Sequence, residues 1–447
     1  MKIVNSICRG AGAAGIAAFA AMPAMAQETA TAAAAAVTVD KGDTAWMMTS
    51  TLLVLMMILP GLALFYGGLT RSKNMLSTMT QIGAAACIAM LVWVCWGYTM
   101  AFGDGGGEII SGFGKLFLSG VTSASTAATF TSGVAIPEYV FICFQMTFAA
   151  ITVALVLGSV VERMKFSATC VFSVVWLTIV YFPIAHMVWA SNGVFFKMGA
   201  LDFAGGTVVH INAGVSALVA ALILGKRIGY PTEAMPPHSL TLTSVGAGLL
   251  WVGWFGFNAG SALEANGSAG LAMINTFVAT ASAALAWLVV EKIAGHRPSA
   301  LGFCSGIVAG LVAVTPAAGN SGPFGAIVLG AVASVVCYFA VTKLKPKLGY
   351  DDALDAFGIH AIGGMIGALG TGIVYAPSLG GPGPADFAIS PQMVTQALAV
   401  GTTIVWSAVG SAIAIYVAKA VTGLRVSADA EREGLDINEH GERAYSY

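Results

Sequence analysis

The sequence predicts an all-α integral membrane protein with eleven transmembrane helices. Of its 447 residues, 57% are hydrophobic and only 9% are charged, whereas about 25% of the residues in an ordinary soluble domain are charged. The apolar residues gather in segments long enough to cross the ~30 Å hydrocarbon core of a bilayer. A net charge of −1 gives no reason to expect nucleic acid as a partner.

The chain begins with the three parts of a secretory signal peptide. Lys2 and Arg9 precede an apolar run from Ala11 to Met22, and Ala24-Met25-Ala26 offers a cleavage site before Gln27. An uncleaved first helix is the alternative, but the run is short for a bilayer. We expect a signal peptide over 1–26, a periplasmic segment over 27–44, a membrane domain over 45–420 and a cytoplasmic tail over 421–447.

Charged or turn-forming residues separate the eleven predicted spans. Arg71 and Lys73 follow the first span, Pro323 opens the ninth, and a Gly- and Ser/Thr-rich stretch from Gly103 to Ala135 precedes the third. That stretch is predicted to be a long periplasmic loop. The spans are expected at 45–69, 77–102, 137–161, 166–189, 204–224, 240–258, 269–291, 300–316, 323–342, 353–374 and 392–418.

The distribution of positive charge predicts the orientation. With the mature N-terminus outside, only Lys41, Lys115 and Lys197 fall in periplasmic segments. Because cytoplasmic loops of membrane proteins carry an excess of Lys and Arg, this pattern favours N-terminus out and C-terminus in. The cytoplasmic residues are then Arg71, Lys73, Arg163, Lys165, Lys226, Arg227, Lys292, Arg297, Lys343, Lys345, Lys347, Lys419, Arg425, Arg432 and Arg443.

The tail from Gly423 to Tyr447 is dense in Asp, Glu and Arg. It is too charged to enter lipid and too short to form a domain, so it is either disordered or a docking element. Composition alone favours disorder.

Six cysteines remain after the signal peptide, none in a CxxC pair, and we expect them to be small buried hydrophobes rather than disulfides or metal ligands. They are Cys87, Cys95, Cys143, Cys170, Cys304 and Cys337.

Two sequence patterns that each occur twice in the chain predict a five-plus-five inverted repeat. Asp202 precedes His210 by eight residues, and Asp352 precedes His360 by the same eight. Small residues follow each histidine, and a Gly/Phe/Gly spacing around Phe65 recurs around Phe257. Five spans separate the members of each pair. Since five is odd, the halves must lie in opposite orientations, as in transporters that hold their site near the midplane.

His210 and His360 are the outstanding candidates, because ionisable groups inside spans are costly and usually face a functional interior. Each falls mid-helix. They could be core histidines satisfied by backbone carbonyls, or metal ligands, although no HExxH motif or further ligand accompanies them. Alternatively, two neutral imidazoles sharing one hydrogen bond would form a polar rung in a dry pore. Such a rung admits a cation that can first lose its proton, as ammonium can and potassium cannot.

Aromatic residues near the outer ends of the spans fit the same picture: Phe144, Phe148, Trp189, Trp254 and Phe257. Trp254 is equally well explained as an ordinary interfacial belt residue. Trp189 is the best candidate for a face toward a cation, and Ser261 can accept a hydrogen bond from one. Asp202 is a transport carboxylate or, more simply, the cap of the fifth helix. Asp352 has the same reading at the cytoplasmic end.

Three segments resemble the ammonium transporter (Amt/Mep/Rh) family, bacterial Amt branch, and the likeness extends over nearly the whole mature chain. They begin at Leu59-Pro60-Gly61, Asp202-Phe203-Ala204 and Gly253-Trp254-Phe255. The tail stretch Glu431-Arg432-Glu433-Gly434-Leu435-Asp436 shares the likeness. The resemblance implies a homotrimer in the cell inner membrane with one pore per subunit. It also implies that the tail and loops dock a PII-type nitrogen regulatory protein, which replaces the expectation of a merely disordered tail.

The resemblance also implies roles for single residues. Trp189 and Ser261, with Phe148, match a cation recruitment site, Phe148 and Phe257 a phenylalanine gate, and Phe144 and Trp254 the vestibule and pore wall. His210 and His360 match twin histidines, and Asp202 an aspartate needed for function. No cofactor, metal or enzymatic activity is implied.

We therefore expect selective uptake of ammonium, which loses its proton outside and crosses as ammonia. An ammonium sensor that signals through its tail is the alternative, which the lack of an output domain after Tyr447 disfavours. An intramembrane serine protease using Ser321 is a remote rival, since Ser321 lies between Pro316 and Pro323 in a predicted periplasmic turn.

Overall fold

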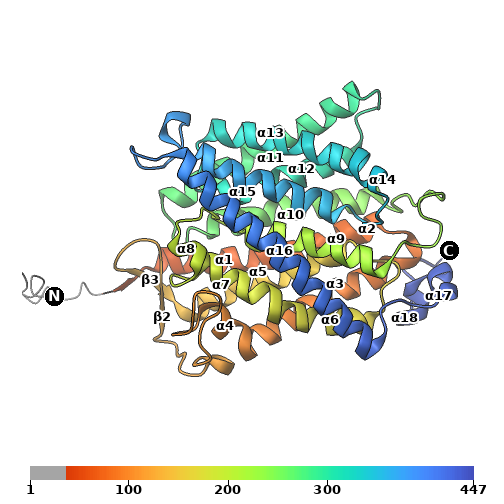
Figure 1. Ribbon diagram of the computed structural model, residues 1–447, viewed down its shortest axis with the longest axis horizontal. Coiled ribbons are helices and arrows are strands. Elements are labelled where there is room, and N and C mark those ends of the chain that lie inside the picture. The colour runs from red at the N-terminus through yellow and green to blue at the C-terminus, as the bar shows by residue number, and fades with distance from the viewer. Residues whose placement is uncertain (1–36, 447) are drawn as a thin grey trace, which may run out of the picture. The chain divides into compact units, whose positions relative to one another are not determined.

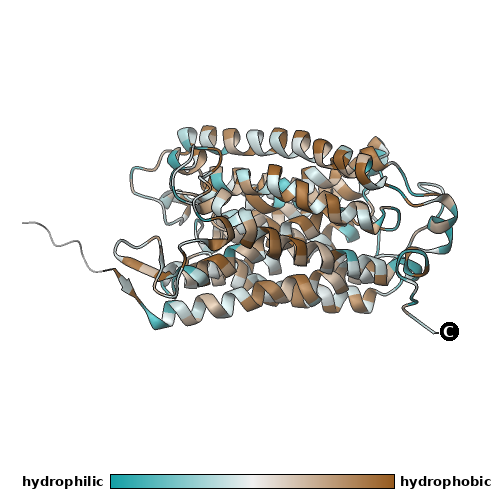
Figure 2. Ribbon diagram, turned by 90° about the horizontal axis from the view of Figure 1, so that it is seen from below, coloured by the Kyte–Doolittle hydropathy of each residue, from teal (hydrophilic) through white to brown (hydrophobic). Residues whose placement is uncertain are grey.

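The computed structural model describes residues 37–446, which are mostly helical (Figure 1). The predicted signal peptide, 1–26, and most of the segment 27–44 lie outside the described residues. Within residues 37–446, eleven helices are long and apolar enough to cross a membrane. Figure 2 shows that the bodies of the helices are apolar, whereas polar residues gather toward their ends and in the connecting segments.

Several spans are continuous helices, and others change their winding on the way through. The eleven are α1 (Lys41–Met56), η1 (Met57–Leu62) and α2 (Ala63–Leu69); η2 (Ser72–Asn74), α3 (Met75–Val92), η3 (Trp93–Gly97) and α4 (Tyr98–Phe102); α5 (Glu138–Leu157); α6 (Phe166–Trp176), η5 (Leu177–Tyr181), α7 (Phe182–Trp189) and α8 (Val194–Lys197); η6 (Gly206–Ile211) and α9 (Asn212–Leu224); α10 (Leu240–Gly260); α11 (Gly267–Ile293); α12 (Ala300–Val314) and η7 (Thr315–Ala317); α13 (Pro323–Phe339), η8 (Ala340–Leu344) and α14 (Lys345–Leu348); η9 (Phe357–Ala361) and α15 (Ile362–Val374); and α16 (Ile389–Thr422).

All eleven predicted spans coincide with these helices, with ends that differ by up to eight residues. The tenth span begins at Phe357 rather than at residue 353. The reason is local, because the carboxylate of Asp352 accepts hydrogen bonds from the backbone N–H groups of Ala356 (3.1 Å) and Phe357 (2.7 Å). A side-chain acceptor in this position caps a helix and fixes its first turn.

A small three-stranded sheet, which the sequence reading missed, covers one end of the helix bundle (Figure 1). Strand β3 (Val134–Pro137) is central, pairing in parallel with β1 (Thr38–Val39) and antiparallel with β2 (Thr126–Ala128). The predicted loop 103–135 therefore carries strands and one 3₁₀ turn, η4 (Leu116–Leu118). We call this end of the bundle the sheet side and the opposite end, which carries the C-terminal residues, the tail side.

The C-terminal tail is ordered, so the expectation of disorder that its composition favoured is wrong. It forms two short helices, α17 (Ala428–Glu433) and α18 (Leu435–His440). The carboxylate of Asp436 accepts hydrogen bonds from the N–H groups of Leu76 (3.1 Å) and Ser77 (2.8 Å) in the first turn of α3. Glu439 accepts one from Phe166 N (2.8 Å), at the start of α6. Acidic tail residues thus satisfy helix N-termini that would otherwise lack partners.

A buried ion-pair network holds the tail-side loops together. The carboxylate of Glu162 pairs with Arg71 (2.8 Å) and Arg227 (3.0 Å), and Arg227 also pairs with Asp351 (2.8 Å). Burial alone would raise the pKa of Glu162, but the charges of Arg227 and Arg71 outweigh it and hold that pKa below its ordinary value. Burial would also raise the pKa of Asp351, but the hydrogen bond from Arg227 and the positive charges of Arg163 and Arg227 outweigh burial and lower that pKa.

This network predicts loss of stability in acid. A carboxyl group with a lowered folded pKa stabilises the folded state above its unfolded pKa of about 4, and that contribution disappears as the pH falls through the folded value. We expect Glu162→Gln to cost about 3 kcal/mol at neutral pH, because it leaves Arg227 and Arg71 short of a buried partner. Unfolding measured in detergent from about pH 6 down to about pH 3 should show a smaller fall for the variant than for the wild type. Equal slopes for both proteins would contradict this reading.

The six cysteines remain unpaired, but the expectation that all are buried is wrong. Cys304 and Cys337 are buried, whereas Cys87 and Cys143 are exposed and Cys95 and Cys170 are half-buried. Apolar character alone does not distinguish a helix face that packs on a neighbour from one that faces outward.

Candidate functional site

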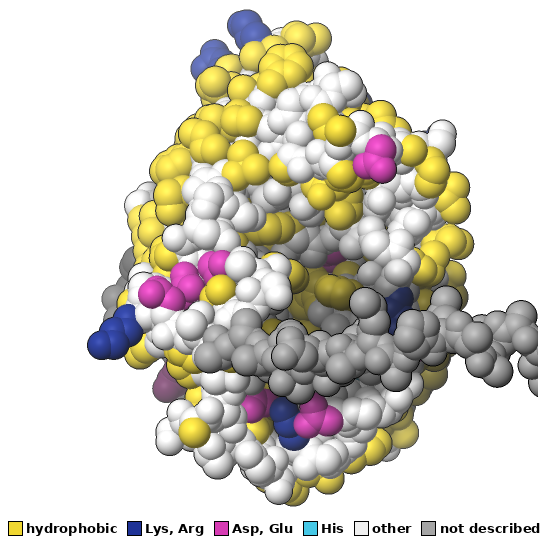
Figure 3. All heavy atoms as spheres, turned by 90° about the vertical axis from the view of Figure 1, so that its left-hand side faces the viewer, with side chains coloured by type: hydrophobic (Ala, Val, Ile, Leu, Met, Phe, Trp, Pro, Cys, Tyr) yellow, Lys and Arg dark blue, Asp and Glu magenta, His cyan; other side chains and the backbone are white. Residues whose placement is uncertain are grey.

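Three cavities follow one another through the helix bundle. The outer cavity, of about 600 Å³, opens on the sheet side, and Figure 3 shows it as a hollow with hydrophobic atoms inside and acidic side chains nearby. A cavity of about 420 Å³ lies at the tail side. Between them is a central cavity of about 10 Å³, a volume on the scale of a single water molecule. Its lining is almost wholly apolar, and two histidines are the exception.

Aromatic rings and one hydroxyl line the floor of the outer cavity. Phe148 meets Phe144 (ring centroids 4.9 Å apart) and Trp189 (5.6 Å) edge to face. The indole N–H of Trp189 donates to the carbonyl oxygen of Asp202 (2.9 Å), which fixes the plane of the ring. The hydroxyl of Ser261 donates to Phe257 O (2.8 Å), so its oxygen keeps lone pairs for a donor in the cavity.

Two stacked phenylalanines separate the outer cavity from the central one. Phe148 lines the outer cavity and Phe257 lines the central one, and their rings stack with centroids 4.2 Å apart at 25°. Phe148 comes from α5 and Phe257 from α10. Both are buried, so a molecule can pass only if these rings move.

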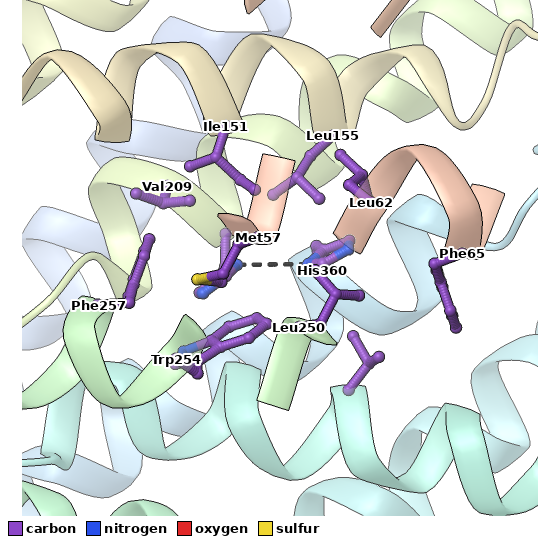
Figure 4. A pocket seen from close by; sticks show the side chains of 12 residues that line it. Met57, Leu62, Phe65, Ile151, Leu155, Val209, Leu250, Trp254, Phe257 and His360 are labelled. Atoms are coloured by element: carbon purple, nitrogen blue, oxygen red, sulfur yellow. Dashed lines mark hydrogen bonds between the residues drawn. The ribbon is translucent and has the colours of Figure 1, made fainter. Parts of the chain in front are cut away.

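The two histidines meet in the central cavity. Nδ1 of His360 lies 3.3 Å from Nδ1 of His210, the contact drawn as a dashed line in Figure 4. Trp254 stacks on His210 at 5.5 Å and donates its indole N–H to the hydroxyl of Thr315 (2.9 Å). Trp254 is only 2% exposed, so it is not an interfacial belt residue. The contribution of Thr315 was missed, and no signal in the sequence pairs it with Trp254.

Both histidines occupy π-helical turns, η6 and η9, near the start of their spans. The expectation that each lies mid-helix is therefore wrong. The helices begin late because a capped irregular segment precedes each of them. Reciprocal glycines let these spans cross, since a Cβ on Gly214 would lie 2.3 Å from Ala361 N and one on Gly364 would lie 3.1 Å from the Cβ of His210. Each glycine follows its histidine by one turn.

Asp202 acts as the cap that the conservative reading assigned to it. Its carboxylate accepts hydrogen bonds from the N–H groups of Gly205 (3.0 Å), Thr207 (3.0 Å) and Val208 (3.2 Å), among others. Burial raises the pKa of Asp202 above its ordinary value, although these hydrogen bonds work against the rise. Burial also raises the pKa of Asp352 to about 6, against the opposing charge of Lys345. Asp202 additionally lines the outer cavity.

The geometry of the histidine pair limits what it can do. Two neutral rings joined through Nδ1 leave one Nε2 as an acceptor and the other Nε2 as an N–H donor. Nε2 of His210 has no hydrogen-bond partner among the described residues, whereas His360 also borders the tail-side cavity. Within residues 37–446, no group of three or more His, Cys, Asp or Glu side chains is arranged to hold a metal ion. The pair therefore suits a small neutral molecule that both donates and accepts.

The serine protease reading gains no support from Ser321. Its hydroxyl is buried and donates to the carbonyl oxygen of Gly322 (2.8 Å), between η7 and α13. A nucleophilic serine needs a base within hydrogen-bonding reach, and a backbone carbonyl is not one.

Comparisons with known proteins agree with this architecture. The family profile described as Ammonium Transporter Family matches residues 45–445. An ammonium transporter from Aquifex aeolicus is 49% identical over 407 residues, covering 91% of this chain and 94% of the relative. One from Bacillus subtilis is 45% identical over 407 residues, covering 90% and 98%. Crystalline Mep2 from Candida albicans has a TM-score of 0.79 at 32% identity, with 88% of this chain and 87% of that chain covered. A solved sensor Amt protein has a TM-score of 0.81 at 28% identity, with 89% and 98% covered.

Proposed function

Since the chain belongs to the ammonium transporter family, we propose that it takes up ammonium selectively, capturing the cation in the outer cavity and passing it inward as ammonia. The observation that carries this proposal is the contact between His210 and His360 in a central cavity of about 10 Å³. A desolvated space of that size, with two linked imidazoles as its polar groups, disfavours a charged occupant. Ammonia is small, neutral and able to donate and accept.

Capture takes place where the outer cavity offers ring faces and a free lone pair. Trp189 and Phe148 present the faces of their aromatic rings, and Ser261 presents its hydroxyl oxygen. These groups replace part of the hydration shell that a cation loses when it enters the cavity. Phe144 forms the wall beside them. Asp202 adds negative charge when it is ionised and holds the carbonyl to which Trp189 is anchored.

Proton loss then supplies the selectivity. The stacked pair of Phe148 and Phe257 closes the way to the histidines and keeps bulk water out of the central cavity. A cation crossing this barrier would lose its hydration with no ionic partner, at a cost of many kcal/mol. Ammonium avoids that cost by giving its proton to water in the outer cavity, which opens on the sheet side, while potassium has no proton to give. Trp254 forms the wall beside His210, and reprotonation follows in the tail-side cavity.

The surroundings of the transporter follow the same resemblance. We place it in the inner membrane as a homotrimer with one pore per subunit, with the sheet side periplasmic and the tail side cytoplasmic. The excess of Lys and Arg on the tail side supports that orientation. A PII-type nitrogen regulatory protein would then meet the tail-side face, where the docked α17 and α18 border the loops.

An ammonium sensor is the second candidate, favoured by the likeness to the solved sensor Amt protein. A sensor would bind ammonium at the same outer cavity without moving it at a useful rate. Proteoliposomes separate the two, because after an ammonium pulse a transporter changes the membrane current, or changes the internal pH faster than in protein-free liposomes, whereas a sensor does neither.

Ser261→Ala tests the capture step. Removing an acceptor from a bound cation should raise the half-saturating ammonium concentration about tenfold, with little change in maximal rate. Ser268→Ala, a serine of the same cavity whose side chain makes no hydrogen bond that anchors these rings, is the matched control. The measurement is the initial rate in proteoliposomes over a range of ammonium concentrations. Equal half-saturation in the two variants would remove Ser261 from the recruitment site.

A further inference from the structure

A short segment without regular secondary structure, residues 199–205, forms part of the floor of the outer cavity. Ala200, Leu201, Asp202 and Phe203 all line that cavity. Irregular backbone inside a membrane protein must find hydrogen-bond partners within the protein. The carboxylate of Asp202 satisfies the N–H groups that follow it, but the backbone before Asp202 needs another partner.

That partner is Gln396, from the last membrane-spanning helix, α16. Its Oε1 accepts a hydrogen bond from Leu201 N (2.7 Å), and its Nε2 donates to Leu201 O (2.9 Å). The side-chain amide of Gln396 therefore pairs with both the N–H and the C=O group of Leu201, as the backbone of a neighbouring β-strand would. The other N–H of Nε2 donates to Ala368 O in α15 (2.6 Å), and the side chain is only 2% exposed.

Asp202, the residue after Leu201, connects this fixed backbone to Trp189 and to the helix that carries His210. The carbonyl of Asp202 orients Trp189, and its carboxylate caps the helix that carries His210. Ala368 lies on the helix that carries His360. One amide thus joins the floor of the outer cavity to the spans of both histidines.

We propose that Gln396 is a positioning residue for the cation site: it fixes Leu201 so that Asp202 holds Trp189 against Phe148. The inference rests on the proposed function, since it assigns the effect of Gln396 to ammonium capture. Among the described residues, Gln396 forms no hydrogen bond with the aromatic rings or the histidines, so it acts through the backbone between them.

A buried glutamine could instead serve packing alone, and two substitutions distinguish these roles. Gln396→Met keeps the length of the side chain and removes the three hydrogen bonds to Leu201 and Ala368, together with the one that Oε1 accepts from Nε2 of Gln392 (3.2 Å). Gln396→Glu keeps the shape and, when protonated, regains one donor and one acceptor, which is what the pair with Leu201 requires. When ionised, it places a charge against the carbonyl oxygens of Leu201 and Ala368. Only the glutamate variant should therefore respond to pH through this contact.

The experiment measures ammonium transport in proteoliposomes at about pH 5.5 and about pH 8.5, a range in which a buried glutamate can titrate. We expect Gln396→Met to raise the half-saturating ammonium concentration about tenfold at both pH values, with a much smaller effect on the maximal rate. Gln396→Glu should lie within about threefold of the wild type at the lower pH and about tenfold or more above it at the higher pH. Each variant is compared with the wild type at the same pH.

Gln81→Met is the matched control, because Gln81 is another buried glutamine with hydrogen bonds to Met164 O and Ser77 but lies outside the cavities described above. It should lower stability without changing half-saturation. Two results would overturn the proposal: unchanged half-saturation in Gln396→Met, or a Gln396→Glu variant whose ratio to the wild type does not vary with pH. Absence of transport by the wild-type protein would instead defeat the proposed function.

Discussion

Replacing Asp202 by alanine is expected to destabilise the protein by about 4 kcal/mol, because several buried N–H groups at the start of η6 lose their acceptor together. Transport should fall with the folded fraction. Asp202→Asn should show an intermediate loss, since its NH₂ group would face the N–H of Thr207 or of Gly205. The measurement is the unfolding midpoint in detergent beside the transport rate of the protein that remains folded.

Asp352→Ala is the matched control for that prediction. It removes a cap with two backbone donors just before the span that carries His360 and should cost about 1–2 kcal/mol. If Asp202→Ala unfolded no more readily than Asp352→Ala and yet failed to transport, the carboxylate would act on the substrate. The structural role would then be secondary.

Gly214→Ala is the second substitution with a large expected effect. The new Cβ would lie 2.3 Å from Ala361 N and 2.7 Å from the Cβ of Ala361. Because the obstacle is backbone, the two spans must separate, at a cost of roughly 2–3 kcal/mol. His360, which is next to Ala361 in the chain, would move away from His210 together with Ala361. The distance of 3.3 Å between the two Nδ1 atoms would then lengthen. We expect transport per folded molecule to fall by at least about tenfold.

Gly401→Ala provides the comparison. Gly401 lies within α16, and a Cβ there meets nothing within 4 Å, so alanine should be neutral or slightly stabilising in that helix. Both variants are assayed by thermal unfolding and by transport in proteoliposomes. Full activity in Gly214→Ala would mean that the crossing of the two histidine spans does not control the site.

The sequence was most informative where a feature depends on a run of residues. Eleven apolar runs predicted eleven spans, and the equal spacing of Asp202–His210 and Asp352–His360 indicated which two spans meet. The late start of η9 was not foreseen, because the apolar segment was predicted to begin at residue 353. Only the hydrogen bonds that Asp352 accepts show that the helix begins later. Composition also failed for the tail, whose acidic residues pair with helix N-termini far away in the sequence.

Site residues that act through other residues escaped prediction altogether. Thr315 anchors Trp254, and Gln396 anchors Leu201, yet each lies far from its partner in sequence. A threonine or glutamine within a span has no distinctive pattern, so only the fold shows what it contacts. The proposed roles of Trp189, Ser261 and the two histidines came from their residue types and positions and from resemblance, and they remain predictions.

The central claim is that the linked histidines let ammonium pass as ammonia and exclude ions that cannot lose a proton. Its most direct test compares wild-type protein with the His210→Ala/His360→Ala double variant in proteoliposomes, recording current and internal pH after pulses of ammonium or potassium. After subtraction of the response of protein-free liposomes, the wild type should respond to ammonium and not to potassium, and this difference should disappear in the double variant. A double variant that retains the full wild-type difference would contradict the claim.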